Sequence, residues 1–348
     1  MKFNVYEAWQ PEWKSAIERI DSKLADIYFL PEWYATWENY EHSVSKCIVA
    51  EEDDFLFVYP FLMRSIEGFD LATECFDIQS AYGYGGVITN SLNVPQYLTD
   101  KFNKKVTEWL TDNNVIAEFV REHPLLDHCR RDADYVLARK NIYIEVSRNY
   151  RIPELKNHQN VSKFRRDEKL KVVIDDRLEG MDEFVRLYHL SANRIGMSKY
   201  YFFSNEYFSL IKNLLKDHAR LINIYYEDHL IHSLIYLFNG NKASLHLAGA
   251  DHSLYKFNLS AVSFFESVLY SAELGLETVN IGGGLTADEQ DGLYRFKKNF
   301  SNNIKDVYIG KKVISQLVYD SLVSQWEEKY PHLRDKYKRF FLKYRQVD

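Results

Sequence analysis

Cysteine is scarce in this chain of 348 residues. Only Cys47, Cys75 and Cys129 are present, widely spaced and without a CxxC pair. Such a set is typical of reduced thiols rather than of a disulfide framework. The cysteines therefore favour a protein that works in the cytoplasm.

Long hydrophobic runs are also lacking. The longest apolar stretch, FLFVYPFLM at residues 55–63, is too short to span a bilayer and predicts a buried strand. The first residues, MKFNVYEAWQPEWK, contain no apolar segment of the signal-peptide kind. We therefore expect a cytoplasmic protein, with peripheral contact at the inner membrane face left open.

Several chemistry-bearing motifs are absent as well. The chain has no HExxH, and His229 and His232 lie on a strand-like run without a third metal ligand. It has neither GxSxG nor GxxxxGK[ST]. These absences argue against a metal site, a hydrolase-type serine nucleophile and a phosphate-binding P-loop.

The chain contains fewer basic than acidic residues. The 44 Lys and Arg residues are outnumbered by 50 Asp and Glu, which gives a formal net charge of −6, so we expect no DNA partner. Hydrophobic residues at 46% and charged residues at 27% are typical of a folded protein, and the length favours two domains. The 26 Tyr and 22 Phe indicate a well-filled core or a cleft walled by rings.

Periodicity predicts alternating helices and strands. In the first part of the chain, helices are expected at 11–24, 31–40 and 95–112, and strands at 47–52, 55–63, 69–80 and 115–120. In the second part, helices are expected at 155–171, 181–195, 205–217 and 258–275, and strands at 172–174, 219–227, 229–238, 242–250, 277–281 and 306–310, before a charged C-terminal helix.

The two parts share an order of elements. Each contains a strand, a loop, a helix and a second strand at comparable spacing, beginning at residues 76–80 and 244–249. Hairpins followed by a crossover helix imply a mixed sheet. We therefore predict an α/β (α+β) fold with two related domains, each a mixed, mostly antiparallel sheet flanked by helices.

The stretch VNIGGGLTADEQDGLYRFKKNFS, residues 279–301, places three glycines after a predicted strand. Thr286 and Glu289 fit a capping box, which predicts that a helix starts there. Leu293, Phe296 and Phe300 form its apolar stripe, and Lys297 is turned about 100° from Phe296, toward the loop. The glycines allow a ligand to approach, with free amides for an anionic oxygen; a tight turn beside a surface lysine is the alternative.

These residues resemble a known family. IGGG…DGLYRFKKNFS looks like the C-terminal signature of FemA/FemB-like aminoacyltransferases and their GNAT acyltransferase relatives. Further similar segments occur in the same order between residues 75 and 310: AYGYGG at 81–86, VREHPL at 120–125, HQNVSKFRRDEKLKVVI at 158–174 and SANRIGMSKYYFFSNEYF at 191–208.

The resemblance implies two GNAT-like domains: residues 1–150, completed by a C-terminal helix at 312–348, and residues 151–311. It also implies transfer of an aminoacyl or acyl group to an amine of a cell-envelope precursor, a peptidoglycan peptide or an amino sugar, in cell wall biogenesis. The donor would be aminoacyl-tRNA or acyl-CoA, with no covalently bound cofactor. The chain has neither a long helical arm nor a Q/R-x-x-G-x-G/A turn, so both donors stay open.

Two other functions stay open too. One is a CoA-dependent N-acyltransferase in polysaccharide or small-molecule biosynthesis. The other is a non-catalytic protein that binds a glycan or a lipid-linked precursor.

Acyl transfer from an activated ester or thioester needs mainly alignment and dispersal of oxyanion charge. By family match at the FK pair, Lys297 would neutralise a phosphate or the oxyanion. As a carboxylate, Asp77 would accept the amine proton directly or through water. Tyr84 is the third catalytic candidate. The substrate-binding candidates are Tyr82, Gly85, Gly86, Arg121, His123, Arg194, Tyr200, Gly282, Gly283, Gly284 and Phe296.

Each candidate has a structural alternative. Lys297 could be a solvated lysine, Asp77 a surface carboxylate, and Tyr82 and Tyr84 core residues beside a structural glycine turn. Arg121 and His123 could hold a diphosphate or form a structural ion pair. His246 alternates with apolar residues and is expected to be a satisfied core histidine.

Two basic segments carry local positive charge. Residues 156–171 contain six Lys or Arg against two acids, and residues 327–345 contain seven against three. Either could contact tRNA phosphates or an anionic membrane, or could be a solvated helix face.

Overall fold

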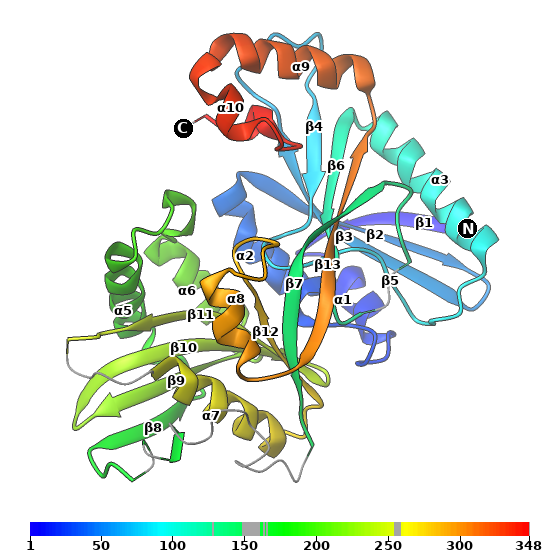
Figure 1. The fold of residues 1–348 in the computed structure, drawn as a ribbon. Helices are drawn as coiled ribbons and strands as arrows, with labels where there is room; N and C mark the ends of the chain where they lie inside the picture. The colour runs from blue at the N-terminus through cyan, green and yellow to red at the C-terminus, as the bar shows by residue number, and fades with distance from the viewer. Residues whose placement is uncertain (127–128, 148–160, 163, 165, 254–258, 348) are drawn as a thin grey trace. The chain divides into compact units, whose positions relative to one another are not determined.

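The structure is a computed structural model that describes residues 1–126, 129–147, 161–162, 164, 166–253 and 259–347 (Figure 1). The chain forms two compact units. Unit 1 contains residues 1–24, 28–137 and 307–348, and unit 2 contains residues 25–27 and 138–306. The chain thus leaves unit 1 at residue 137 and returns at residue 307, before the expected boundaries at 150 and 311. Most of the basic helix expected at 155–171 lies outside the described residues.

Unit 1 is built on a sheet with the strand order β1-β2-β3-β4-β6-β13, with β5 paired to β3. Its strands are β1 (Lys2–Glu7), β2 (Ser43–Glu52), β3 (Phe55–Ser65), β4 (Phe76–Gln79), β5 (Ile88–Thr89), β6 (Val115–Arg121) and β13 (Asn303–Val313). The β4–β6 pair is parallel, and the other registered pairs are antiparallel.

Its main helices are α1 (Pro11–Glu18), α2 (Pro31–Glu41), α3 (Gln96–Asp112), α9 (Gln316–Lys329) and α10 (Arg334–Tyr337). The apolar run at 55–63 forms β3, as predicted, and is buried along most of its length. Helix α3 connects β4 to β6 and buries Leu98, Phe102, Val106 and Leu110, which share one face at four-residue spacing. Leu322 and Trp326 of α9 pack against Ile116 and Ala117 of β6, so the C-terminal helix belongs to the core of unit 1.

Unit 2 has the strand order β7-β12-β11-β10-β9-β8. Its strands are β7 (Asp134–Glu145), β8 (Leu170–Asp175), β9 (Ala219–Tyr226), β10 (His229–Asn239), β11 (Lys242–Ala250) and β12 (Thr278–Gly283). Its helices include α5 (Met181–Arg194), α6 (Asn205–Leu214), α7 (Leu259–Glu273) and α8 (Gly292–Lys298). The β11–β12 pair is parallel and the other pairs are antiparallel.

The two units therefore share one plan. In each, a crossover helix joins two parallel neighbours within a mostly antiparallel sheet: α3 joins β4 to β6, and α7 joins β11 to β12. This confirms the predicted α/β fold class. Strands β1, β5 and β7 were not expected from the sequence, although Ile142 and Ile144 of β7 show the alternation of a half-buried strand.

In the described part of the chain, no helix combines the length and the apolarity that a membrane crossing requires.

Candidate active site

The parallel strands of unit 2 separate partway along their length. Their register covers Lys242 to Ser244 of β11 and Thr278 to Asn280 of β12, whereas β11 continues to Ala250 and β12 to Gly283. Residues 245–248 of β11 are only half-buried, although this strand is internal to the sheet. We call residues 245–250 and 281–283 the β11–β12 opening.

The glycine turn, residues 282–284, ends β12 at this opening. Gly282 has φ +77°, a left-handed conformation that favours glycine. A Cβ on Gly283 would lie 2.0 Å from the backbone oxygen of Lys140, so a side chain does not fit there. The amide of Gly282 donates to Asn280 Oδ1 at 2.9 Å. This amide is therefore not one of the free donors that the sequence suggested.

Helix α8 begins later than the sequence predicted. Its N-cap is Asp291, whose carboxylate accepts the amide of Tyr294 at 2.9 Å and the amide of Leu285 at 3.0 Å. The capping-box prediction for Thr286 and Glu289 is wrong: Thr286 Oγ1 accepts the nearby amide of Asp288, and Glu289 pairs with Lys140.

The expected apolar stripe of α8 is only partly confirmed. Phe296 and Phe300 pack against Phe264 of α7, with ring centroids 5.8 and 5.2 Å away. Leu293 is 39% exposed, and Tyr294 takes the buried position instead because the helix starts at Gly292. Phe296 thus anchors α8, and its contact with a substrate remains a prediction.

Lys297 points back to the glycine turn, as its angular position on the helix predicted. Its ammonium donates to the carbonyl oxygen of Gly283 at 3.1 Å. Burial first, and then the neighbouring Arg139, lower the pKa of Lys297 to about 7, against the opposing effect of Asp291. The side chain is half-buried rather than a freely solvated surface lysine.

Arg139 is a functional candidate that the sequence reasoning missed. It lies on β7, and its Nη1 donates to the carbonyl oxygen of Gly284 at 3.4 Å. The strand pairing of β7 with β12, which includes Gly283 opposite Asn141, brings it to the turn. No local motif marks Arg139, because its position beside the turn depends on a pairing between residues far apart in the sequence.

His246 lies on the part of β11 that has left β12. Its Nε2 and the hydroxyl of Tyr207 are 2.7 Å apart, and burial lowers the pKa of His246 to about 3. The expectation of a satisfied histidine is confirmed. The imidazole is neutral at physiological pH and serves as a polar contact rather than as a charge.

In unit 1, the parallel strands β4 and β6 are the counterpart of β11 and β12, and the chain itself fills the space beyond their paired residues. Beyond β4, the amide of Ser80 donates to Phe119 O at 3.1 Å, and Gly85 forms a parallel bridge with Glu122. The amide of Gly85 donates to Arg121 O at 2.7 Å, and that of His123 to Gly85 O at 3.2 Å. The AYGYGG and VREHPL segments therefore meet, and their backbones continue the sheet.

The side chains of these two segments form an aromatic cluster. Tyr84 is buried, with its ring centroid 5.1 Å from those of both Tyr28 and His123. Tyr82 stacks on Trp37 at 4.9 Å, and Arg121 donates to Gly83 O at 3.4 Å. Gly86 has φ +112°, which a glycine tolerates. The packing accounts for these residues structurally, and substrate contact by Tyr82, Tyr84, Gly85, Gly86, Arg121 and His123 remains a prediction.

Asp77 lies in a different environment from the one expected. It is fully buried and pairs with Arg64 at 2.9 Å and Arg345 at 2.8 Å, and Tyr344 donates to it at 3.0 Å. Burial alone would raise the pKa of Asp77, but Arg64 and Arg345 outweigh burial and lower it. A carboxylate held this way is a weak proton acceptor, so the environment favours a structural ion pair and is not that of a surface carboxylate.

The remaining candidates are exposed. Arg194 ends α5, and Tyr200 is 45% exposed with its ring edge against Tyr201. Their contact with a donor remains a prediction. Among the described residues, no group of three or more His, Cys, Asp or Glu could hold a metal ion.

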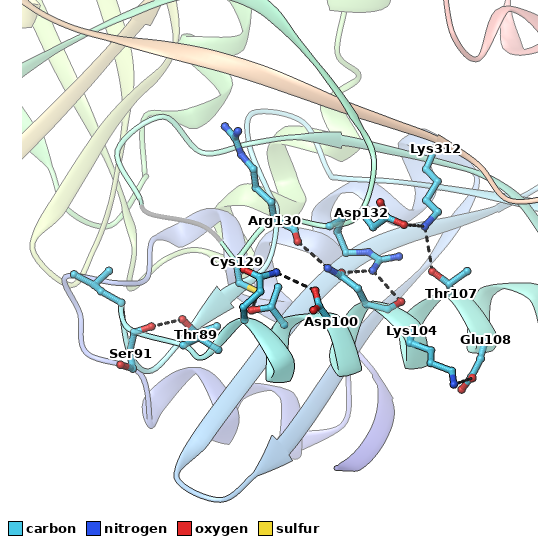
Figure 2. A pocket seen from close by; sticks show the side chains of 16 residues that line it. Thr89, Ser91, Asp100, Lys104, Thr107, Glu108, Cys129, Arg130, Asp132 and Lys312 are labelled. Carbon is cyan, nitrogen blue, oxygen red and sulfur yellow. Dashed lines mark hydrogen bonds and ion pairs between the residues drawn. The ribbon is translucent and has the colours of Figure 1, made fainter.

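Unit 1 also contains an open pocket of about 930 Å³ along α3, lined mostly by residues of polar and charged type. Figure 2 shows Lys312 joined to Asp132 and Thr107, and Lys104 beside Glu108. Arg131 at its wall is buried and pairs with Glu118 at 2.8 Å. The charges of Lys104, Arg131 and Lys312 therefore pair within the protein.

Comparison with known proteins identifies the second unit. Residues 157–298 match the model of the acetyltransferase (GNAT) domain family. The matched range ends just after Lys297 and includes the β11–β12 opening and the glycine turn. The comparison with curated proteins gave no match.

Solved structures share the whole fold. FemX is 14% identical with a TM-score of 0.68, over 92% of this chain and 99% of that one. The C-terminal domain of a putative lysylphosphatidylglycerol synthetase from Agrobacterium fabrum is 12% identical with a TM-score of 0.55, over 91% and 96%. A conserved protein of unknown function from Bacteroides thetaiotaomicron is 11% identical with a TM-score of 0.56, over 89% and 99%. The acetyltransferase (GNAT) domain model thus covers most of unit 2, and the chain as a whole shares the fold of FemX.

Proposed function

We propose that the chain transfers an aminoacyl or acyl group from an activated donor to an amine of a cell-envelope precursor, a peptidoglycan peptide or an amino sugar. The observation that carries this proposal is the β11–β12 opening of unit 2, with Lys297 at the glycine turn that ends β12. The envelope precursor as acceptor rests on the resemblance of the sequence motifs to FemA/FemB-like aminoacyltransferases, and the fold shared with FemX is consistent with that resemblance.

The opening suits a donor with an extended, amide-bearing arm. Where two parallel strands separate, the backbone N–H and C=O groups on their facing edges are too far apart to bond to each other and can pair with an inserted chain. A pantetheine-like arm has amides of the required kind. This argument favours acyl-CoA as the donor, and so a CoA-dependent N-acyltransferase is the second candidate function.

Lys297 would act on charge that develops during the reaction. The amine nitrogen attacks the carbonyl carbon, the bond from that carbon to the ester oxygen or thioester sulfur breaks, and the proton lost by the amine passes to the leaving oxygen or sulfur. A protonated Lys297 beside the glycine turn would stabilise the oxyanion of the tetrahedral intermediate. No covalent intermediate with the enzyme is needed, because the donor is already activated.

The test is a transfer assay with the full chain. Labelled aminoacyl-tRNA and labelled acetyl-CoA are incubated separately with a peptidoglycan precursor peptide and with an amino sugar. We expect loss of labelled donor only when an amine is present, and formation of a labelled amide. Labelled donor that stays intact with every acceptor would contradict the proposal and favour the non-catalytic binding role.

Two variants then test the site. Lys297→Ala should lower kcat/KM by roughly 10²- to 10³-fold, the cost of losing one stabilising donor at an oxyanion. Lys298→Ala is the matched control, because Lys298 is the neighbouring residue on α8 and is exposed. Equal activity of Lys297→Ala and the wild type with a working donor would remove Lys297 from the mechanism.

A further inference from the structure

Two cationic side chains from different elements meet at the glycine turn. We propose that Arg139 of β7, together with one N–H of the Lys297 ammonium, binds a phosphoryl group of a substrate, a group that the transfer reaction leaves unchanged. Of the three N–H donors of the ammonium, one binds Gly283 O and one stays available for the oxyanion. This inference rests on the proposed function, since it assigns a binding role within the same site. Arg139 is assigned as a substrate-binding residue.

Both cations donate hydrogen bonds to the carbonyl oxygens of adjacent residues in the turn. The Lys297 ammonium is 3.1 Å from Gly283 O, and Arg139 Nη1 is 3.4 Å from Gly284 O. A Cβ on Gly282 would lie 2.9 Å from Lys297 Nζ, and one on Gly283 would lie 3.6 Å from Arg139 Cδ. The turn therefore contacts both side chains, although Arg139 and Lys297 lie near opposite ends of the unit 2 sequence.

The carbonyl groups orient these cations without neutralising them. Among the described residues, neither Arg139 nor Lys297 forms an ion pair within 4.0 Å. Asp291 is the carboxylate that acts on Lys297, and both of its oxygens already accept backbone amides. Lys140 and Glu289 pair with each other. When Lys297 is protonated, two positive charges therefore face one carboxylate whose oxygens already accept backbone amides, which leaves an excess of positive charge at the turn.

This excess has an energetic consequence. Partial burial and the like charge of Arg139 both disfavour the protonated form of Lys297. An anion in contact with both side chains would offset that repulsion through charge-assisted hydrogen bonds. A phosphoryl group fits best, because its several oxygens can accept from the guanidinium fork and from the ammonium together.

The phosphoryl group could come from either substrate. A donor such as acyl-CoA or aminoacyl-tRNA carries phosphates, and so does a nucleotide-linked or lipid-linked acceptor. The chemistry at the turn is the same in both cases. Kinetics separate the sources: Arg139→Gln should raise the KM of the substrate that contributes the phosphoryl group and leave the KM of the other unchanged.

The direct test uses inorganic pyrophosphate as the probe. Isothermal titration calorimetry on the full chain compares wild type, Arg139→Gln, Lys297→Gln and Arg295→Gln. Each of the first two variants should weaken binding about ten- to a hundredfold, the effect of one charge-assisted hydrogen bond. Arg295 is exposed on α8, and Arg295→Gln should bind as the wild type does. No binding to the wild type, or equal binding to Arg139→Gln, would overturn the proposal.

A second measurement does not depend on catalysis. Nuclear magnetic resonance of the labelled lysine side chains follows the pKa of Lys297. Removal of the like charge in Arg139→Gln should raise this pKa, and pyrophosphate should raise it in the wild type. An unchanged pKa in both experiments would show that the two cations do not share a site. Pyrophosphate binding without transfer from any donor would refute the proposed function and leave the anion site standing.

Discussion

The ammonium of Lys297 lies 3.1 Å from the carbonyl oxygen of Gly283, fourteen residues earlier in the chain. This contact joins the end of β12 to the last turn of α8 and holds the lysine beside the β11–β12 opening. A backbone carbonyl fixes the position of the cation and leaves its charge available to a substrate.

The pKa of Lys297, lowered to about 7, predicts a pH dependence. Raising the pH through 7 removes the proton, so kcat/KM should fall on the alkaline side of the profile if the ammonium is required. Arg139 and Asp291 are the charged groups that act on this lysine, so Arg139→Gln should move the alkaline limb to higher pH. Lys297→Arg keeps its charge at all accessible pH values and should abolish the limb. A wild-type profile that is flat from pH 6 to 9 would contradict a role for the ammonium.

Asp77→Asn should destabilise the protein instead of slowing transfer specifically. The substitution leaves Arg64 and Arg345 without their shared carboxylate, and breaking a buried ion pair costs about 3–5 kcal/mol. Urea unfolding measures this cost, with Asp70→Asn at an exposed position as the control, expected within about 0.5 kcal/mol of wild type. Unchanged stability together with lost transfer would restore Asp77 as a catalytic candidate.

The lowered pKa of Asp77 also sets the direction of an acid effect. Its folded-state pKa lies below its ordinary value, so its ion pairs stabilise the protein above the unfolded-state pKa. That stability should be lost as the pH falls through the folded-state pKa. In Asp77→Asn, this part of the acid destabilisation should be missing from unfolding curves recorded at successive pH values.

Two glycines near Lys297 should respond differently to alanine. Gly282→Ala strains a left-handed backbone, at a cost of about 1–2 kcal/mol, and its Cβ would lie 2.9 Å from Lys297 Nζ. We expect reduced thermal stability and reduced transfer. Gly292→Ala, at the first position of α8, meets nothing within 4 Å and should be tolerated or stabilise by up to about 1 kcal/mol. Full activity in Gly282→Ala would mean that the position of the ammonium is not critical.

His246 should stay neutral throughout the working pH range. Burial lowers its pKa to about 3, and the Tyr207 hydroxyl lies 2.7 Å from its Nε2. Histidine resonances followed by nuclear magnetic resonance should therefore show no titration of His246 between pH 5 and 8. A midpoint inside that range would make His246 a candidate general base.

Much of the fold followed from local patterns. The apolar run at 55–63 became β3, and the four-residue spacing of Leu98, Phe102, Val106 and Leu110 became the buried face of α3. Strand β7 was missed because its first half is largely exposed, so alternation is visible only near Ile142 and Ile144. The start of α8 was misjudged because two capping signals compete, and Asp291 caps the helix in place of Thr286.

For this protein, the sequence alone determined the family resemblance, the duplicated order of elements and the direction in which Lys297 points. Each depends on residues close together in the chain, where helix and strand periodicity act directly. Only the tertiary structure decided that Arg139 meets Lys297, that Asp77 is buried between arginines from positions 64 and 345, and that β11 separates from β12. Those outcomes depend on strand register and on the packing of distant segments, which no local pattern encodes.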